Sequence, residues 1–252
     1  MTERTAAARR AIGLIDLTDL ADDHSPDGID ELCRRAREHA TAAVCVWPEF
    51  VGTCAEQLRG SGVRVATVVN FPSGDEPVDD VIRTVVTALA EGADDIDLVL
   101  PYRALLAGDV DRAATLVAAV AELVHPPKLL KVILETGALD DRATVTAAAR
   151  LAVENGADFV KTSTGKIPAG ASLEAVAAML DVIAGAGRPV GLKPSGGIRT
   201  FDEAMSYVDL ADSVMGEGWS APATFRFGAS GLLDALLGVI DGEQDVPGTA
   251  DY

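Results

Sequence analysis

The chain has 252 residues, of which 48% are hydrophobic, and its formal net charge at pH 7 is −18. This length is enough for one large α/β domain, and no apolar run approaches the roughly 20 residues that cross a bilayer. The negative charge argues against nucleic acid as a partner, because binding a phosphate backbone needs a basic face.

Apolar runs alternate with amphipathic segments, a pattern typical of a parallel sheet covered by helices. In chain order the periodicity predicts helix 2–10, strand 12–18, helix 30–41, strand 42–48, helix 51–60, strand 63–70, helix 78–91, strand 94–100, helix 109–124, strand 129–135, helix 140–155, strand 159–163, helix 172–184, strand 190–194, helix 201–208, strand 224–228 and helix 232–240. Eight such repeats in about 250 residues predict a (β/α)8 TIM barrel with a short N-terminal helix. A doubly wound open sheet is the alternative.

We expect residues 1–252 to form a single catalytic domain, because no linker or shift in composition interrupts the pattern. Segment 241–252 is polar and carries Gly and Pro, so we expect it to be a mobile tail. Cys33, Cys45 and Cys54 are too few and too scattered for a disulfide framework or a zinc site. With no signal-peptide pattern at the N-terminus, these features indicate a cytoplasmic protein.

Polar side chains at the carboxyl ends of barrel strands face the active site. The predicted strands place eight residues there: Asp16, Thr18, Asn70, Asp97, Glu135, Lys161, Lys193 and Ser195. Asp97 lies on the strand face opposite Ile96 and Leu98, so it points into the barrel if those two pack outward on helices. A structural ion pair of Asp97 with a lysine or with Arg103 is the alternative to a role in proton transfer.

Lysine is scarce, and the sequence contains only five: Lys128, Lys131, Lys161, Lys166 and Lys193. A buried lysine is costly unless it is paired or neutral, and both burial and nearby positive charge lower its pKa. A neutral amine is the nucleophile that forms Schiff bases. The central hypothesis is that Lys161 is this nucleophile and that Lys193 is the cation that keeps it unprotonated.

Two structural interpretations are set beside that hypothesis. In the first interpretation, Lys161 is a salt-bridged lysine that only fills the barrel. Lys131 and Glu135 share a face of strand 129–135, and for them an internal ion pair is the preferred interpretation.

Three glycine-bearing turns follow the late strands, at 164–166, 195–199 and 227–231. Glycines let backbone N–H groups approach a phosphate closely, and Lys166 or Arg199 would add positive charge. Phosphate sites in barrels are often built from the loops after strands seven and eight, so we expect a phosphorylated substrate. No motif for a metal or a nucleotide cofactor is present, which favours chemistry without a cofactor.

Four motifs together resemble the deoxyribose-phosphate aldolase family: DDIDLVLPYRAL at 94–105, FVKTSTGK at 159–166, GLKPSGGIRT at 191–200 and RFGAS at 226–230. Shorter pieces at 16–18, 44–48 and 70–72 are also similar to it, and the resemblance spans residues 12–233. It implies a TIM-barrel class I aldolase that reversibly cleaves 2-deoxy-D-ribose 5-phosphate to D-glyceraldehyde 3-phosphate and acetaldehyde. A homodimer is the expected assembly.

By motif position, the resemblance makes Lys161 the Schiff-base lysine, Lys193 the partner that lowers its pKa, and Asp97 the acid/base. It places Lys166, Gly196, Gly197 and Ser230 on phosphate-binding turns. The candidate substrate-binding residues are completed by Asp16, Cys45, Thr164 and Gly228.

The chain departs from the family pattern at Gly231, where many members carry a second serine. The chain ends in Tyr252, as in the branch whose flexible tail brings a terminal tyrosine to the site for proton transfer. Another Schiff-base aldolase acting on a different sugar phosphate is the alternative function, and a non-catalytic metabolite sensor is a third hypothesis.

Overall fold

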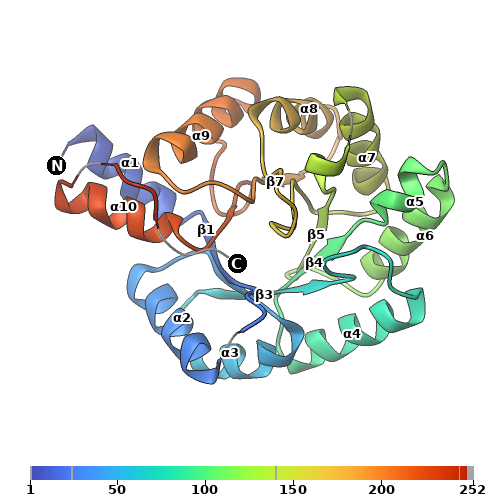
Figure 1. Cartoon of the computed structure of the whole chain (residues 1–252), viewed down its shortest axis with the longest axis horizontal. Helices are drawn as coiled ribbons and strands as arrows, with labels where there is room; N and C mark the ends of the chain where they lie inside the picture. Colours follow the sequence, from blue (N-terminus) through green and yellow to red (C-terminus); the bar gives the residue numbers. More distant parts are fainter. Residues whose placement is uncertain (1, 24, 140, 244, 249–252) are drawn as a thin grey trace.

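Eight parallel strands close into a barrel at the centre of the molecule (Figure 1). The computed structural model describes residues 2–23, 25–139, 141–243 and 245–248. Within them the strands are β1 (Ile15–Asp19), β2 (Ala43–Val46), β3 (Arg64–Val69), β4 (Asp95–Val99), β5 (Leu129–Ile133), β6 (Phe159–Lys161), β7 (Gly191–Lys193) and β8 (Phe227–Ala229). β1 pairs with both β2 and β8, and bridges from Leu192 to Phe225 and from Ser195 to Gly228 close the gap beside β7. The predicted (β/α)8 barrel is confirmed.

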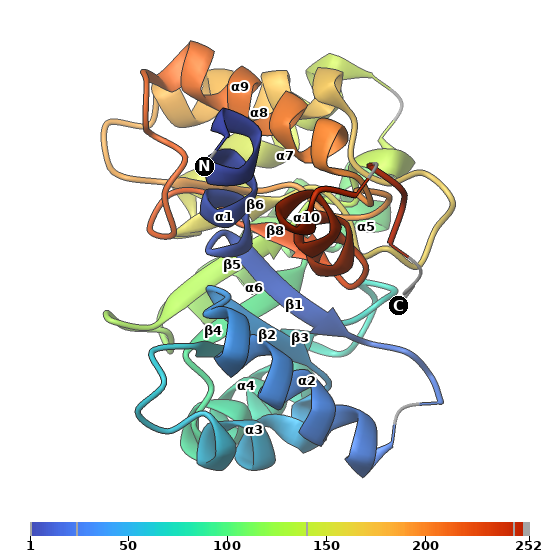
Figure 2. The same ribbon diagram turned by 90° about the vertical axis from the view of Figure 1, so that its left-hand side faces the viewer.

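A ring of helices surrounds the strands, as Figures 1 and 2 show from two directions. The helices are α1 (Glu3–Ile12), α2 (Pro26–His39), α3 (Val51–Gln57), α4 (Val78–Glu91), α5 (Tyr102–Leu106), α6 (Val110–Ala121), α7 (Arg142–Glu154), α8 (Leu173–Ala184), α9 (Phe201–Met215) and α10 (Leu232–Asp241), with 3-10 turns at Pro48–Phe50 and Thr136–Ala138. α1 is the expected short N-terminal helix, and it packs against α10. None of these helices is long and apolar enough to cross a membrane, as far as the described residues go.

The hydrophobic core lies between the barrel and its helices. Every residue of β2 and β4 is buried, and each helix buries one stripe, as α4 does with Val81, Val85 and Ala88. Strands covered on their outer face and packed within the barrel are protected on both sides, which explains why they read as nearly continuous apolar runs.

Two glycines allow the chain to leave a helix toward the next strand where it packs closely against a neighbouring helix. Gly92 and Gly156 follow α4 and α7 with positive φ angles of 111° and 105°. A Cβ atom at Gly92 would lie 2.8 Å from Ala55 Cβ, and one at Gly156 would lie 2.7 Å from Ala121 Cβ. Any larger residue would push neighbouring helices apart.

Some boundaries differ from the prediction for identifiable reasons. Ile12 ends α1 instead of opening β1, because it continues the buried helix face of Ala8 and Ala11. α2 begins at Pro26, earlier than predicted, where Ser25 caps the helix by accepting a hydrogen bond from Gly28 N at 3.2 Å. The short helix α5 was not predicted, and α9 continues well beyond position 208.

Candidate active site

Lys161 and Lys193 lie side by side at the carboxyl ends of β6 and β7, where the strand register pairs them directly. Both side-chain nitrogens contact the same oxygen of Asp97 on β4, with Nζ to Oδ2 distances of 2.9 Å and 2.7 Å. All three side chains are buried. The structure therefore brings together the three residues that the sequence singled out for catalysis.

Asp97 points into the barrel because Ile96 and Leu98 occupy the outer face of β4, buried in the hydrophobic core. The alternative partner Arg103 instead donates to Asp75 Oδ2 at 2.6 Å. Asp97 is thus paired with lysines, at the centre of the barrel.

A third lysine joins this group, and here one prediction was wrong. Lys131 Nζ lies 2.6 Å from Asp95 Oδ2 and 3.2 Å from Asp97 Oδ1, and no ion pair joins it to Glu135. β5 ends at Ile133, and Glu135 has a left-handed φ of 55°, so the strand alternation does not extend to it. The Glu135 carboxylate accepts hydrogen bonds from the backbone N–H and the hydroxyl of Thr164.

Asp16, on β1, is held from both sides. Its Oδ2 lies 2.6 Å from Lys193 Nζ, and its Oδ1 accepts a hydrogen bond of 2.7 Å from Arg226. Asp95 is likewise bound by Arg64 Nη2, at 2.5 Å. Arg226 and Asp95 received no role from the sequence, although the period of two along β4 places Asp95 on the same face as Asp97.

These contacts shift the pKa values of Asp97, Asp16 and Lys193. Burial alone would raise the pKa of the Asp97 carboxyl, but the lysines around it, Lys131 foremost, lower that pKa well below its usual range. The pKa of Asp16 is lowered against burial by Lys193 and Lys131. Burial would lower the pKa of Lys193, yet Asp16 and Asp97 raise it well above its usual range. Lys193 is therefore a cation held between two ionised carboxylates.

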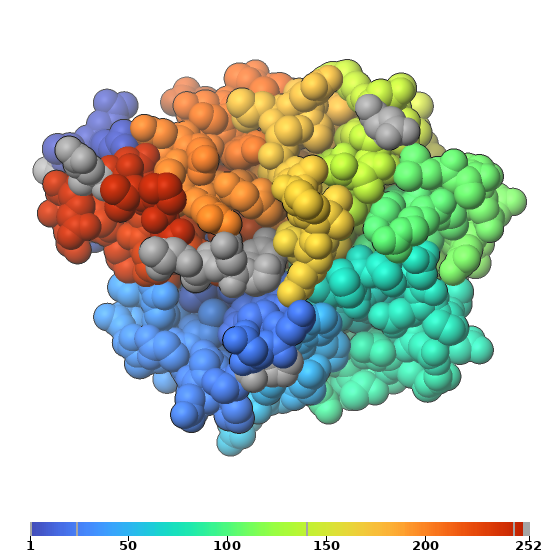
Figure 3. Space-filling model, viewed as in Figure 1, coloured from blue at the N-terminus to red at the C-terminus, as the bar shows by residue number. Residues whose placement is uncertain are grey.

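A cavity of about 280 Å³ lies beside this group, among the glycine-bearing turns. Its lining comprises Gly165, Ile167, Pro168, Gly170, Gly196, Gly197, Ile198, Arg199, Gly228, Ala229, Ser230 and Gly231. The yellow segment after β6 lies near the middle of the face in Figure 3. Gly196 and Gly197 have φ angles of 84° and 83°, which larger residues rarely adopt.

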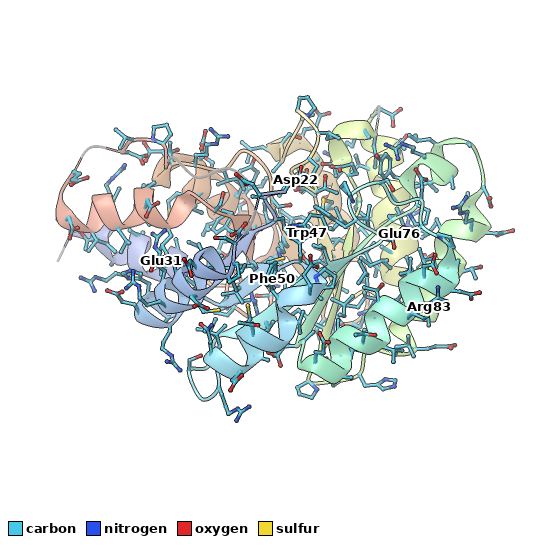
Figure 4. The ribbon with its side chains drawn as sticks, turned by 60° about the horizontal axis from the view of Figure 1, so that its bottom comes forward. Asp22, Glu31, Trp47, Phe50, Glu76 and Arg83 are labelled. Atoms are coloured by element: carbon cyan, nitrogen blue, oxygen red, sulfur yellow. The ribbon has the colours of Figure 1, made fainter. Side chains whose placement is uncertain are left out.

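Lys166 does not line this cavity, although its neighbours Gly165 and Ile167 do. Its Nζ lies 3.4 Å from Asp22 Oδ1. Figure 4 shows Asp22 near Trp47 in the middle of the view, whereas Glu31 and Arg83 lie toward the periphery. The lysine is thus close to the site but paired with an exposed carboxylate.

The other strand-end candidates brace the loops around the site. Thr18 Oγ1 donates to Asp16 O at 2.8 Å, Asn70 Nδ2 to Val99 O at 2.8 Å, and Ser195 Oγ to Ser163 O at 2.6 Å. Thr164 Oγ1 accepts from Lys166 N at 3.0 Å, and Cys45 is buried in β2. Burial raises the pKa of the Cys45 thiol, which disfavours a nucleophilic thiolate.

Tyr252 lies outside the described residues. The preceding segment 245–248 reaches the rim of the cavity, where Gly248 N donates to Arg199 O at 3.1 Å. Asp245 accepts hydrogen bonds from Phe201 N and Asp202 N, at 2.9 Å and 3.0 Å. In the part of the chain that the structure describes, no group of three His, Cys, Asp or Glu residues could hold a metal ion.

Comparisons with known proteins find aldolases. The model of the DeoC/LacD family aldolases matches residues 10–237. Deoxyribose-phosphate aldolase of Agrobacterium fabrum (strain C58 / ATCC 33970) is 46% identical over 249 residues, which cover 98% of this chain and 96% of that one. A solved structure from Coccidioides immitis, assigned as a deoxyribose-phosphate aldolase, is 31% identical with a TM-score of 0.82 over 92% of this chain and 86% of its own. The tetrameric deoxyribose phosphate aldolase of Aeropyrum pernix, 24% identical, shares the fold with a TM-score of 0.77 over 95% and 93% of the two chains.

Proposed function

Because the chain belongs to the DeoC/LacD family of aldolases, we propose that it is a class I aldolase, a lyase that works through a Schiff base. Its reaction is the reversible cleavage of 2-deoxy-D-ribose 5-phosphate to D-glyceraldehyde 3-phosphate and acetaldehyde. The relative from Agrobacterium fabrum, similar over nearly the whole chain, supports this substrate. The observation that carries the proposal is the position of Lys161 beside Lys193 and Asp97.

Lys161 has fewer carboxylate partners than the other buried basic side chains. Buried salt bridges join four basic and three acidic side chains, namely Lys131, Lys161, Lys193, Arg226, Asp16, Asp95 and Asp97. Lys161 contacts one of these carboxylates, whereas Lys193 contacts two. The proposed nucleophile is therefore the buried lysine with the fewest ion-pair partners.

The first half of the reaction forms the Schiff base. Neutral Lys161 Nζ attacks C1 of the open-chain aldehyde, and the carbinolamine forms as a proton passes from nitrogen to oxygen. Asp97 accepts the proton that leaves the nitrogen, and the Lys193 ammonium protonates the hydroxyl that departs as water. The product is an iminium ion on Lys161, which withdraws electrons from C2.

The second half breaks the carbon–carbon bond. A base, Asp97 acting through water, takes the proton of the C3 hydroxyl, and the electrons of the C2–C3 bond flow into the iminium. Glyceraldehyde 3-phosphate leaves, and the enamine of acetaldehyde stays on Lys161. Protonation of this enamine at C2 and hydrolysis of the resulting iminium release acetaldehyde and restore the amine.

The glycine-lined cavity is the proposed site for the substrate phosphate. Backbone N–H groups of its turns and the N-terminus of α10 would face the anion, and Arg199 would supply positive charge. Ser230 adds a hydroxyl, whereas Gly231 does not, so this pocket offers one side-chain hydrogen bond fewer than a pair of serines. Lys166 would join if its side chain turned from Asp22 toward the phosphate.

Borohydride reduction in the presence of acetaldehyde, with a chelator included, tests the assignment. We expect mass spectrometry to find the reduced adduct on Lys161, and Lys161→Ala to lose both the adduct and turnover. An adduct on another lysine, or turnover that survives the substitution, would reject the role of Lys161. Binding of the sugar phosphate without any adduct would favour the sensor hypothesis.

Substrate choice needs a separate measurement, because another Schiff-base aldolase would also form an adduct. We expect kcat/KM for 2-deoxyribose 5-phosphate to exceed that for ribulose and fructose phosphates. A higher kcat/KM for ribulose or fructose phosphate would show that this aldolase acts on a different sugar phosphate.

A homodimer, a cytoplasmic location and a tail tyrosine complete the proposal. Tyr252 is four positions beyond Gly248 in the sequence, a reach of up to ~14 Å in extended chain. Because Gly248 is at the cavity rim, this reach supports proton transfer by Tyr252. Tyr252→Phe should slow turnover without changing adduct formation on Lys161. Analytical sedimentation would test whether the protein is a homodimer.

A further inference from the structure

Arg226 is a buried cation without a part in the proposed reaction. It comes just before β8, is 3% exposed, and donates through Nε to Pro222 O at 2.5 Å. Its Nη1 lies 2.7 Å from Asp16 Oδ1 and 3.8 Å from Asp95 Oδ2. A guanidinium so deeply buried is costly to accommodate, and a hydrophobic side chain of similar volume would fill the barrel at lower cost.

Asp16 connects Arg226 to the reacting groups. One carboxylate oxygen faces Arg226, and the other lies 2.6 Å from Lys193 Nζ and 3.4 Å from Lys131 Nζ. The hydrogen bond from Nη1 holds Oδ1 in place, which leaves Oδ2 directed at Lys193. Since Lys193 is hydrogen-bonded to Asp97, the orientation is transmitted to the oxygen that also binds Lys161.

Strands β1 to β7 and the residue just before β8 each contribute a charged or titratable group to this interior. The groups are Asp16 of β1, Cys45 of β2, Arg64 of β3, Asp95 and Asp97 of β4, Lys131 of β5, Lys161 of β6, Lys193 of β7, Arg226 beside β8, and Glu135 in the loop after β5. Glu135 is bonded to Thr164 and lies outside the salt-bridged network, and Arg64 is 26% exposed at the edge of it. The positive charges of Lys131, Lys193 and Arg226 therefore already balance the negative charges of the three aspartates before Lys161 takes a proton.

We propose that Arg226 is a positioning residue for the aldol reaction: it orients Asp16 toward Lys193 and supplies fixed positive charge that keeps Lys161 unprotonated. This inference rests on the proposed role of Lys161 as the Schiff-base nucleophile. Arg226 does not touch the substrate. Its effect passes through Asp16 and through the electrostatic potential of the barrel interior, where charges are screened little by solvent.

The test follows the rate of borohydride-trapped acetaldehyde adduct on Lys161 as a function of pH. The acidic limb of this profile is the pH range in which the rate rises as Lys161 loses its proton. Loss of a nearby positive charge in Arg226→Met should move this limb to higher pH by about one unit or more. Asp16→Asn removes a negative charge and should move the limb down. Arg226→Lys keeps the charge and should leave the limb in place. Its rate should be slower, because a lysine cannot bind Pro222 O and Asp16 Oδ1 from the two positions that Nε and Nη1 occupy.

Arg188→Met is a matched control for the loss of an arginine. Arg188 donates to the carbonyl oxygens of Val153 and Ala157, away from the interior network, so its profile should overlay the wild type. Shifts of opposite sign for Arg226→Met and Asp16→Asn are an electrostatic signature that general loosening of the fold does not produce.

Unshifted limbs in both charge-removing variants, or shifts of the same sign, would overturn the proposal. Should Arg226→Met fail to fold, Arg226→Lys, Asp16→Asn and the charge-matched double variant Arg226→Met with Asp16→Asn still decide it. The double variant should have a limb closer to the wild type than Asp16→Asn alone. Failure of the proposed function is distinguishable, because the wild-type enzyme would then give no adduct on Lys161.

Discussion

Lys161 and Lys193 are partners across β6 and β7, and their nitrogens share one oxygen of Asp97, at 2.9 Å and 2.7 Å. A carboxylate oxygen between two amines can accept a proton from one and remain hydrogen-bonded to the other. Lys193 keeps its charge because Asp16 binds it from the opposite side, at 2.6 Å. The geometry thus gives two chemically identical side chains different surroundings.

Removal of the Lys193 charge should suppress Schiff-base formation near neutral pH. In Lys193→Met we expect kcat/KM at pH 7 to fall by about 10²–10⁴-fold, because both a proton donor and the cation beside Lys161 are lost. Adduct formation should recover in part at higher pH, where Lys161 releases its proton without help. Stopped reactions with borohydride across pH 6–10 would measure this.

Lys128→Met is the matched control for that substitution. Lys128 precedes β5 at the opposite end of the barrel and donates to Ala93 O. Its pH profile should match that of the wild type. Equal losses in the two variants would point to destabilised protein and not to the charge beside Lys161.

Phosphate recognition should depend on Arg199 more than on Lys166. Arg199 lines the glycine cavity, whereas Lys166 does not. Arg199→Met should raise KM for 2-deoxyribose 5-phosphate by about 10–100-fold, the worth of one charged hydrogen bond. Turnover of unphosphorylated 2-deoxyribose should not change.

Lys166→Met separates two positions of the lysine side chain. An effect on KM as large as that of Arg199→Met would show that Lys166 leaves Asp22 when phosphate binds. An effect on the unphosphorylated sugar, in either variant, would contradict a role confined to the phosphate.

The position of the proposed catalytic trio, Lys161, Lys193 and Asp97, could be predicted from the sequence because each member follows from a local rule. Apolar runs lead into Lys161 and Lys193, and the period of two along β4 directs Asp97 inward. Their meeting follows from barrel geometry, which gathers the carboxyl ends of all strands at one face. Local pattern and global fold agree at these positions.

The deeper network could not be predicted, because its partners are set by closure of the barrel. Asp16 and Arg226 are 210 positions apart and meet because β1 pairs with β8. The Lys131–Glu135 prediction failed for a local reason, since the left-handed backbone at Glu135 interrupts the alternation that it assumed. Single-residue backbone conformations of this kind leave no periodic signal.

A methyl group at Gly228 should damage both stability and turnover. A Cβ atom there would lie 2.7 Å from Ser195 Cβ and 3.2 Å from Lys193 Cε, so the end of β7 would have to shift. Gly228→Ala should lower the free energy of unfolding by about 1–3 kcal/mol, as overpacking does, and reduce kcat by displacing Lys193. Urea unfolding and steady-state kinetics measure the two effects.

Gly52→Ala provides the comparison for that substitution. Gly52 lies in α3, and nothing approaches within 4 Å of the position where its Cβ would be. This variant should be equally active and more stable by about 0.5–1 kcal/mol, because alanine favours the helix. A fully active Gly228→Ala enzyme would show that the β7–β8 contact tolerates more than the distances suggest.

The free energy of unfolding should depend on the protonation of Glu135, and the burial of this carboxyl sets the direction of that dependence. Burial raises the pKa of the Glu135 carboxyl above its ordinary value of 4.5, against the hydrogen bonds from Thr164. The neutral carboxyl of Glu135 therefore favours the folded state. Its contribution to the free energy of unfolding is complete below pH 4.5 and is lost as the pH rises through the pKa of the folded state. Glutamine is neutral throughout and still accepts from Thr164 N.

Glu135→Gln should accordingly gain stability relative to the wild type as the pH rises from 4 to 7. Urea unfolding of both proteins at several pH values measures the difference, in which the titration of all other groups cancels. Glu135→Ala loses the hydrogen bonds as well and should be less stable than Glu135→Gln at every pH. A difference between glutamine and wild type that shrinks with rising pH would mean that the ionised carboxylate, stabilised by Thr164 and Lys161, is the favoured form.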